Sequence, residues 1–119
     1  IVLVNPGIKV ATTKAYEWFD KGKKSKSKGS IKGMINAISK KDVKKIAENM
    51  HNDFDGLIEK KHRIVREIKT NFRKFDALNS MIVGSGPTVI GVFDSIYSAR
   101  EAYFKLKDLY PFVYLTKTF

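Results

Sequence analysis

The chain has 119 residues, enough for one domain with a modest core, and its net charge of +11 favours anionic partners such as phosphates. It has no cysteine, which excludes disulfides, thiolate metal sites and thiol nucleophiles and is compatible with the cytoplasmic location that we expect. No apolar run approaches the roughly 20 residues that span a bilayer, so we expect no membrane-spanning helix.

The first elements along the chain are a strand, a helix and a basic loop. Residues 1–4 form a short apolar run, which the turn signal Asn5-Pro6-Gly7 ends. A threonine at position 12 or 13 can cap a short helix over residues 12–19. Residues 21–32 mix lysines with glycine and serine, a pattern typical of a solvated loop. Because the chain begins inside an apolar run, without methionine, we expect it to be a fragment of a longer protein.

The middle of the chain has the periodicity of helices. Apolar residues recur at helical spacing over residues 31–38. This stripe consists of Ile31, Met34, Ile35 and Ile38. Residues 39–42 have the spacing of a capping box, which predicts a helix start there. The helical spacing continues, so residues 39–75 are expected to form a helical hairpin or one long kinked helix, with a break at Gly56 or at residues 60–62.

The last third of the chain changes to the pattern of strands. Residues 81–83 and 89–93 are apolar, β-branched runs on either side of a Gly-rich turn, which predicts a hairpin. Ser98-Ala99-Arg100-Glu101 has the pattern of a capping box, and the helix that follows is expected to end at Pro111. Residues 112–115 form a last apolar strand.

These elements occur in the order β, helices, β, β, α, β. This order is the split β-α-β pattern of ferredoxin-like α+β sandwiches. We therefore expect a single domain over residues 1–119 with a four-stranded antiparallel sheet. Helices should pack on one face of this sheet, with extra helices in the first crossover.

The Gly-rich turn, Gly84-Ser85-Gly86-Pro87-Thr88, is the most informative local motif. Glycines lack a Cβ, so main-chain N–H groups there can approach phosphate oxygens, and the hydroxyls of Ser85 and Thr88 can donate as well. Taken alone, the five residues slightly favour an ordinary hairpin turn. No lysine and no helix follow directly, so the motif is neither a P-loop nor a dinucleotide-binding fingerprint.

Asn5-Pro6-Gly7 with Thr12 and Tyr16 forms a second candidate site, in which Tyr16 could stack on a base and Thr12 could bond to the base edge. The residues alone favour a simpler interpretation, a turn followed by a helix whose aromatic residues pack in the core. His51 and His62 do not have the spacing of known metal ligands, so we expect no metal site. Asn52-Asp53 is expected to cap or bend a helix.

The segment from Gly84 to Val89 is similar to the C-terminal Gly-rich motif of the GHMP kinases, a family of small-molecule kinases. Four other segments are similar, in the same order, to one branch of that family, whose substrate carries a cytidine diphosphate group. Those segments are residues 2–12, 48–54, 64–69 and 113–118. The resemblance covers nearly the whole chain and rests on the order and spacing of the motifs together.

The resemblance implies the C-terminal half of a two-domain kinase in the non-mevalonate route to isoprenoid precursors. Such kinases transfer the γ-phosphate of ATP, with Mg²⁺, to a substrate hydroxyl in a cleft between the domains. The principal ATP loop and the catalytic lysine and aspartate belong to the N-terminal domain, and none of those motifs is present here. We therefore expect no catalytic residue in this fragment, no tightly bound ATP and no activity without the N-terminal kinase domain of the same chain.

The resemblance also implies roles for particular residues. Residues 84–86 match the motif that lies beside the substrate and the phosphates at the domain cleft, so a side chain at Gly86 is expected to crowd the phosphates. Thr12 and Tyr16 match positions that contact the cytosine of the substrate. Where the family usually has a serine before the motif, this chain has Val83, which removes one hydroxyl.

Two functions from other classes stay open on the residues alone. A basic ferredoxin-like domain can bind RNA, and the same architecture can serve as a small-ligand regulatory module. The strand at residues 89–93 lacks the alternating basic and aromatic residues that stack bases, so nucleic acid is the less favoured partner.

Overall fold

The structure is a computed structural model that describes residues 1–8, 17 and 30–117. The helix expected over residues 12–19, apart from position 17, and the basic stretch up to residue 29 lie outside the described part of the chain.

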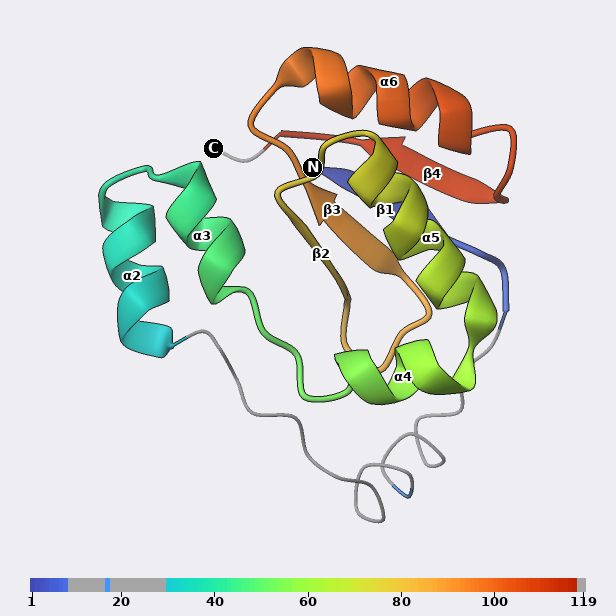
Figure 1. Cartoon of the computed structure of the whole chain (residues 1–119), viewed down its shortest axis with the longest axis horizontal. Helices are drawn as coiled ribbons and strands as arrows, with labels where there is room; N and C mark the ends of the chain where they lie inside the picture. The colour runs from blue at the N-terminus through green and yellow to red at the C-terminus, as the bar shows by residue number, and fades with distance from the viewer. Residues whose placement is uncertain (9–16, 18–29, 118–119) are drawn as a thin grey trace.

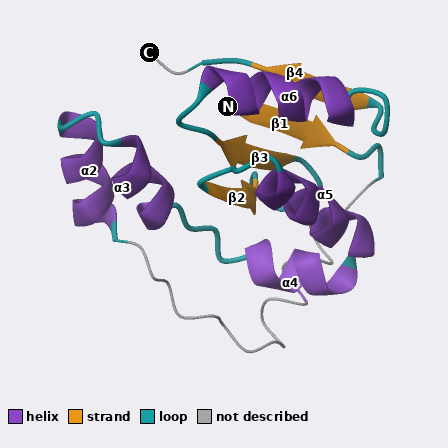
Figure 2. Ribbon diagram, turned by 45° about the horizontal axis from the view of Figure 1, so that its top comes forward, coloured by secondary structure: helices purple, strands orange, loops and turns teal. Residues whose placement is uncertain are grey.

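The described residues form the expected four-stranded antiparallel sheet (Figure 2). Its strands are β1 (Val2–Asn5), β2 (Asn79–Ile82), β3 (Val89–Val92) and β4 (Phe112–Leu115). The spatial order is β2-β3-β1-β4, and Val4 lies opposite Val89 on one side and Val113 on the other. This is the order of a ferredoxin-like sheet, so the fold class read from the element order is confirmed.

The helices follow the expected distribution. They are α2 (Ile31–Ser39), α3 (Val43–Asn49), α4 (Asp55–Lys61), α5 (Arg63–Lys74) and α6 (Ile96–Leu106). The first four lie in the crossover between β1 and β2. Figure 1 shows α5 and α6 over the same face of the sheet, whereas α2 and α3 lie to one side, beyond β2. The crossover therefore covers the sheet with α5 and extends past its edge with α2 and α3.

The region 39–75 contains three helices, not a hairpin of two or one kinked helix. His62 separates α4 from α5, within the expected break at residues 60–62, and Gly56 lies inside α4. A further break lies at residues 50–54, where Asn52-Asp53 is expected to cap or bend a helix. There Asn52 Oδ1 accepts a hydrogen bond from the Phe54 amide at 2.9 Å, which turns the chain between α3 and α4.

Both expected capping boxes are wrong in position. Ser39 is the last residue of α2, and Asp42 caps α3 by accepting from the Lys45 amide at 3.1 Å. Ser98 lies inside α6, which Ser95 caps instead. An N-cap residue needs an extended backbone, and Asp42 and Ser95 have one; sequence spacing does not reveal this.

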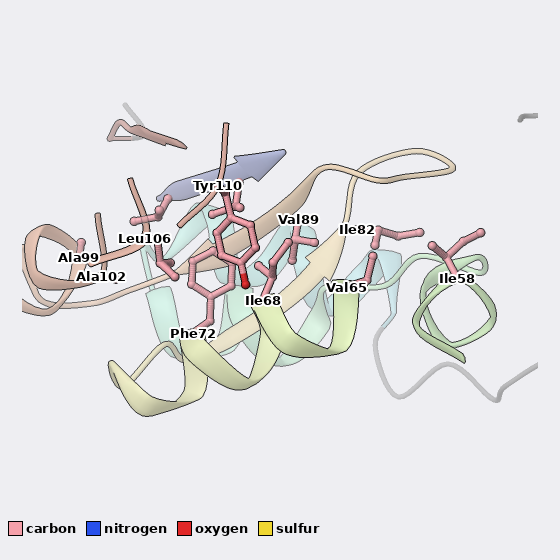
Figure 3. Packing of buried hydrophobic residues seen from close by; sticks show 12 residues of the cluster. Ile58, Val65, Ile68, Phe72, Ile82, Val89, Ala99, Ala102, Leu106 and Tyr110 are labelled. Atoms are coloured by element: carbon pink, nitrogen blue, oxygen red, sulfur yellow. The ribbon is translucent and has the colours of Figure 1, made fainter. Parts of the chain in front are cut away.

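One hydrophobic core lies between the sheet and helices α5 and α6 (Figure 3). Its fully buried members include Val2, Val4, Ile82 and Val89 from the strands, Val65, Ile68 and Phe72 from α5, and Ala102 and Leu106 from α6. Helix α6 buries Ala99, Ala102 and Leu106 in this core and ends at Leu106, before the expected end at Pro111. Tyr110 is buried beyond the end of the helix. In the strands, every second side chain faces the helices, which explains why Val2 and Val4 of β1 are buried.

The apolar stripe on α2 forms a helix but is not buried. Ile31, Ile35 and Ile38 are 83%, 61% and 57% exposed, and Ala37 is the buried residue of this helix. Helix α2 packs on α3 beyond the edge of the sheet and therefore has no second layer of described residues over its apolar face.

Gly91 is required where α5 crosses β3. A Cβ built on Gly91 would lie 2.8 Å from the Phe72 ring, closer than packed atoms approach. We expect Gly91→Ala to lower the free energy of unfolding by about 1–3 kcal/mol through overpacking. Gly56→Ala is the control, because a Cβ there meets nothing within 4 Å. Thermal unfolding that ranks the two variants equally would contradict this account.

Tyr110 joins the turn after α6 to α5. Its hydroxyl donates to Glu67 Oε1 at 3.0 Å and accepts from Asn71 Nδ2 at 3.4 Å. Burial, followed by the hydrogen bond to Glu67 and the negative charge of that carboxylate, raises the pKa of Tyr110 to about 12.

The raised pKa of Tyr110 makes stability pH-dependent in the alkaline range. The unfolded chain releases this proton near pH 10 and the native state near pH 12. The stabilisation is therefore complete below about pH 10 and is lost as the pH rises toward 12. Urea unfolding at about pH 9 and about pH 11 should show a larger loss for the wild type than for Tyr110→Phe. Equal losses in the two proteins would be inconsistent with the raised pKa.

Candidate functional site

The Gly-rich motif forms the hairpin turn between β2 and β3. The Gly86 amide donates to the Val83 carbonyl at 3.0 Å, and the Val83 amide donates to the Thr88 carbonyl at 2.8 Å. Gly84 and Gly86 have φ angles of +62° and +84°, in the region where residues with a Cβ are strained. Gly84 is the first central residue of the four-residue turn and Ser85 has a negative φ, the combination found in type II′ turns. The glycines are therefore required by the backbone of the hairpin.

The outer part of this hairpin keeps hydrogen-bonding capacity. Gly84 is exposed and Ser85 half-buried, and a Cβ built on Gly84 meets nothing within 4 Å. The amides of Gly84 and Ser85 donate no hydrogen bond to any residue that the structure describes, whereas the Gly86 amide is used inside the turn. Two adjacent N–H groups are thus available to an external acceptor, the arrangement by which main-chain nests bind anions.

The inner side of the hairpin is held by Asn52, from the connection between α3 and α4. Its Nδ2 donates to the Ile82 carbonyl at 3.0 Å and to the Gly84 carbonyl at 2.8 Å. Strand β2 is at the edge of the sheet, so the polar groups of Ile82 that face away from β3 need partners outside the sheet. Asn52 supplies one of these partners and at the same time fixes the turn.

Asp55 supplies the other partner at this edge. Its Oδ1 accepts from the Ile82 amide at 2.8 Å, and its Oδ2 lies 2.5 Å from Lys69 Nζ. The same ammonium group lies 2.9 Å from Glu59 Oε2. The Lys69 side chain is 7% exposed, so one buried cation links α5 to two carboxylates of α4. Ile82, at the base of the hairpin, is therefore linked to α4 through Asp55 and to α5 through Lys69.

Thr88 and Asn5 connect the hairpin to the end of β1. Asn5 Oδ1 accepts from the Gly7 amide at 2.9 Å, so Asn5 Nδ2 faces Thr88 Oγ1, 3.2 Å away. Because Thr88 Oγ1 accepts this bond, its own proton can be donated to another group. Both side chains line a pocket of about 350 Å³ on the sheet face opposite the helices. The remaining lining residues are Leu3, Phe112 and Tyr114.

The two glycines of the turn differ in what a side chain would meet. A Cβ at Gly86 would lie 3.4 Å from Ile58 Cγ2 and 3.7 Å from Ile82 Cδ1, on the side of the core. In Figure 3 these two isoleucines lie side by side at this end of the sheet. A Cβ at Gly86 would therefore point toward the core at ordinary contact distance, and Gly84 is the position that faces open space.

The other sequence candidates have different outcomes. Thr12 and Tyr16 lie outside the described residues. His51 Nε2 lies 2.6 Å from Asp53 Oδ1, an exposed local pair. No group of three or more potential metal ligands occurs among the described residues, and none of the described helices is long and apolar enough to cross a membrane.

Three parts of this site were not identified from the sequence. They are the two hydrogen bonds that Asn52 donates, the ion cluster of Lys69, and the contact between Asn5 and Thr88. Lys69 did carry a signal, because it lies four residues after Val65 and three before Phe72, on the apolar face of α5. A charged residue on such a face is buried only with a partner. The partners of Asn5 and Asn52 are distant in sequence and left no local pattern.

Solved structures of two kinases contain a similar fold. Homoserine kinase from Cytophaga hutchinsonii matches with a TM-score of 0.78 and 19% identity over 98% of this chain and 41% of that chain. A 4-(cytidine 5'-diphospho)-2C-methyl-D-erythritol kinase matches with a TM-score of 0.72 and 16% identity over 95% and 40%. At these identities the likeness establishes the fold alone.

The sequence itself establishes the family. Residues 34–111 match the family model described as GHMP kinases C terminal, and the chain therefore belongs to the GHMP kinase family. It is 36% identical to the 4-diphosphocytidyl-2-C-methyl-D-erythritol kinase of Caldanaerobacter subterraneus subsp. tengcongensis, over 99% of this chain and 41% of that protein. The kinase of the same name from Clostridium novyi is 37% identical, over 99% and 42%. The chain thus spans about two fifths of the length of these relatives.

The ion cluster behind the hairpin predicts a large stability effect. We expect Lys69→Met to lower the free energy of unfolding by about 3 kcal/mol, because Asp55 and Glu59 lose their shared cation while partly buried. Lys45→Met is the control, since Lys45 and Glu48 are 63% and 64% exposed and such pairs contribute about 0–1 kcal/mol. Chemical unfolding measures both changes. A Lys69 variant as stable as the control would rule out a structural role for the cluster.

Proposed function

We propose that this chain is the C-terminal, substrate-binding domain of a kinase that uses ATP to phosphorylate a hydroxyl of 4-diphosphocytidyl-2-C-methyl-D-erythritol. The names of the curated relatives support this substrate, because the similarity extends over 99% of the chain. The chain spans 41% of the first of these relatives, so the activity belongs to a longer protein with an N-terminal kinase domain. The observation that carries the proposal is the hairpin with two available amides at Gly84 and Ser85.

The hairpin suits a phosphate group for electrostatic reasons. Amide N–H groups stabilise negative charge without a cation, and they do so best when nearby carbonyl oxygens are turned away. Here the carbonyls of Ile82 and Gly84 bond to Asn52. The Thr88 hydroxyl can add a third donor beside the hairpin. This part of the site would bind and orient a phosphate-bearing substrate, which is a large part of catalysis in phosphoryl transfer.

The chemical step would depend on groups outside this chain. Asp55 and Glu59, the carboxylates behind the hairpin, pair with Lys69 and are not placed to bind Mg²⁺. Mg²⁺ would therefore enter with ATP and be held by the N-terminal domain. The role of Thr12 and Tyr16 in contacting the cytosine, and the cytoplasmic location, stay predictions of the same proposal.

The family membership does not favour the RNA-binding or regulatory alternatives. The side chains on the open face of the sheet also argue against RNA. Met81, Ile90, Leu3 and Tyr114 lie in one row across the four strands, and this row contains no basic residue. RNA-binding sheets of this architecture need basic and stacking residues together on that face.

The proposal predicts which substrate accepts the phosphoryl group, and it predicts that substitution of Gly84 weakens substrate binding in the full-length kinase. Transfer from ATP should occur to 4-diphosphocytidyl-2-C-methyl-D-erythritol and not to homoserine or mevalonate. Gly84→Ala should raise KM for a phosphate-bearing substrate by about tenfold, which corresponds to the loss of about one hydrogen bond to a charged group. Steady-state kinetics with each substrate varied in turn measures this change.

Gly86→Ala is the matched comparison, because Gly86 also has a positive φ but its Cβ would face Ile58. The Gly86 variant should lower the melting temperature as much as the Gly84 variant while raising KM less. Wild-type KM values for Gly84→Ala, or transfer to homoserine instead, would remove the basis of the proposed function.

A further inference from the structure

We propose that Asn52 is a positioning residue of the kinase, which orients the peptide group between Gly84 and Ser85 so that the Ser85 amide faces the substrate phosphate. This assignment rests on the proposed function of the hairpin. Asn52 itself does not touch the substrate in this proposal and acts through the main chain.

The geometry of a peptide group carries the argument. The carbonyl of Gly84 and the amide of Ser85 belong to one planar trans peptide, so they point in opposite directions. Asn52 Nδ2 holds the Gly84 carbonyl at 2.8 Å on the inner side of the hairpin. The Ser85 N–H is thereby directed outward.

The Ile82–Val83 peptide, two peptides earlier in the chain, obeys the same rule. Asn52 also holds the Ile82 carbonyl, at 3.0 Å, and the amide of the same peptide, that of Val83, points the other way to the Thr88 carbonyl at 2.8 Å. The two hydrogen atoms of one side-chain amide thus fix the Ile82–Val83 and Gly84–Ser85 peptides, which lie on either side of the Val83–Gly84 peptide.

The Gly84–Ser85 peptide is the one that most needs such a restraint. It is the central peptide of the turn from Val83 to Gly86, and turn types differ mainly in the orientation of this central peptide. Glycine at position 84 lowers the barrier to other backbone states. A reversed peptide would present the Gly84 carbonyl oxygen to the phosphate and would repel it.

Asparagine has the two features that this role needs. Its Nδ2 carries two hydrogen atoms for two carbonyls, and its Oδ1 accepts from the Phe54 amide at 2.9 Å, which fixes the side-chain orientation. Aspartate would keep the shape and the bond to Phe54. It would lose both donors and place a negative charge against two carbonyl oxygens.

The test is Asn52→Asp in the full-length kinase, with Asn49→Asp as the matched control. Asn49 ends α3 and makes the same kinds of bond, to Lys45 and Ser30, away from the hairpin. Asn52→Asp should act on the same phosphate-bearing substrate as Gly84→Ala. We expect it to raise KM for this substrate by about 10- to 100-fold and to change kcat by less than about threefold. Asn49→Asp should leave both constants unchanged.

Asn52→Ser provides a second variant in case the aspartate variant does not fold. Its hydroxyl is neutral and has a single hydrogen atom, so it cannot donate to two carbonyls. A rise in KM for this variant supports the assignment. A lower melting temperature with unchanged KM in the folded Asn52 variants would show a structural role alone and overturn the proposal.

The kinetics also separate this inference from the proposed function. If Gly84→Ala raises KM and the Asn52 variants do not, the assignment of Asn52 is wrong and the phosphate-binding hairpin stands. If Gly84→Ala has wild-type KM values, the hairpin does not face a phosphate, and both proposals fail together.

Discussion

The edge of strand β2 is the constraint on which the rest of this structure depends. A sheet edge exposes main-chain groups that must find partners, and at Ile82 both groups are taken by side chains from the connection between α3 and α4 and from the start of α4. Asn52 accounts for the carbonyl and Asp55 for the amide. The position of the turn that follows β2 is therefore fixed by residues about 30 positions earlier in the chain.

This constraint links stability to the shape of the hairpin. Asp55 accepts from the Ile82 amide through Oδ1 and pairs with Lys69 through Oδ2. Lys69 lies on α5, which packs on the sheet through Ile68 and Phe72. The same helix α5 forms the core that makes the sheet rigid. This base holds the turn, whose glycines have positive φ angles, although the tip at Gly84 has few contacts of its own.

For the proposed kinase, the arrangement separates binding from chemistry. Main-chain amides and the Thr88 hydroxyl offer donors to a phosphate, while the two carboxylates behind the hairpin both pair with Lys69. Such a domain can orient a charged substrate but has no free base near the hairpin among the residues that the structure describes. The division agrees with a domain that spans about two fifths of its relatives' length.

The sequence by itself determined the order of strands and helices, the ferredoxin-like class and the motif at Gly84, because hydrophobic periodicity and turn residues are local properties. Only the tertiary structure decided which serine caps α6, where α3 ends and which groups Asn52 and Lys69 meet. The contacts of Asn52 with Ile82 and Gly84 join residues 30 and 32 positions apart. No pattern of neighbouring residues encodes such a distance, since the pairing exists only after the helices have packed on the sheet.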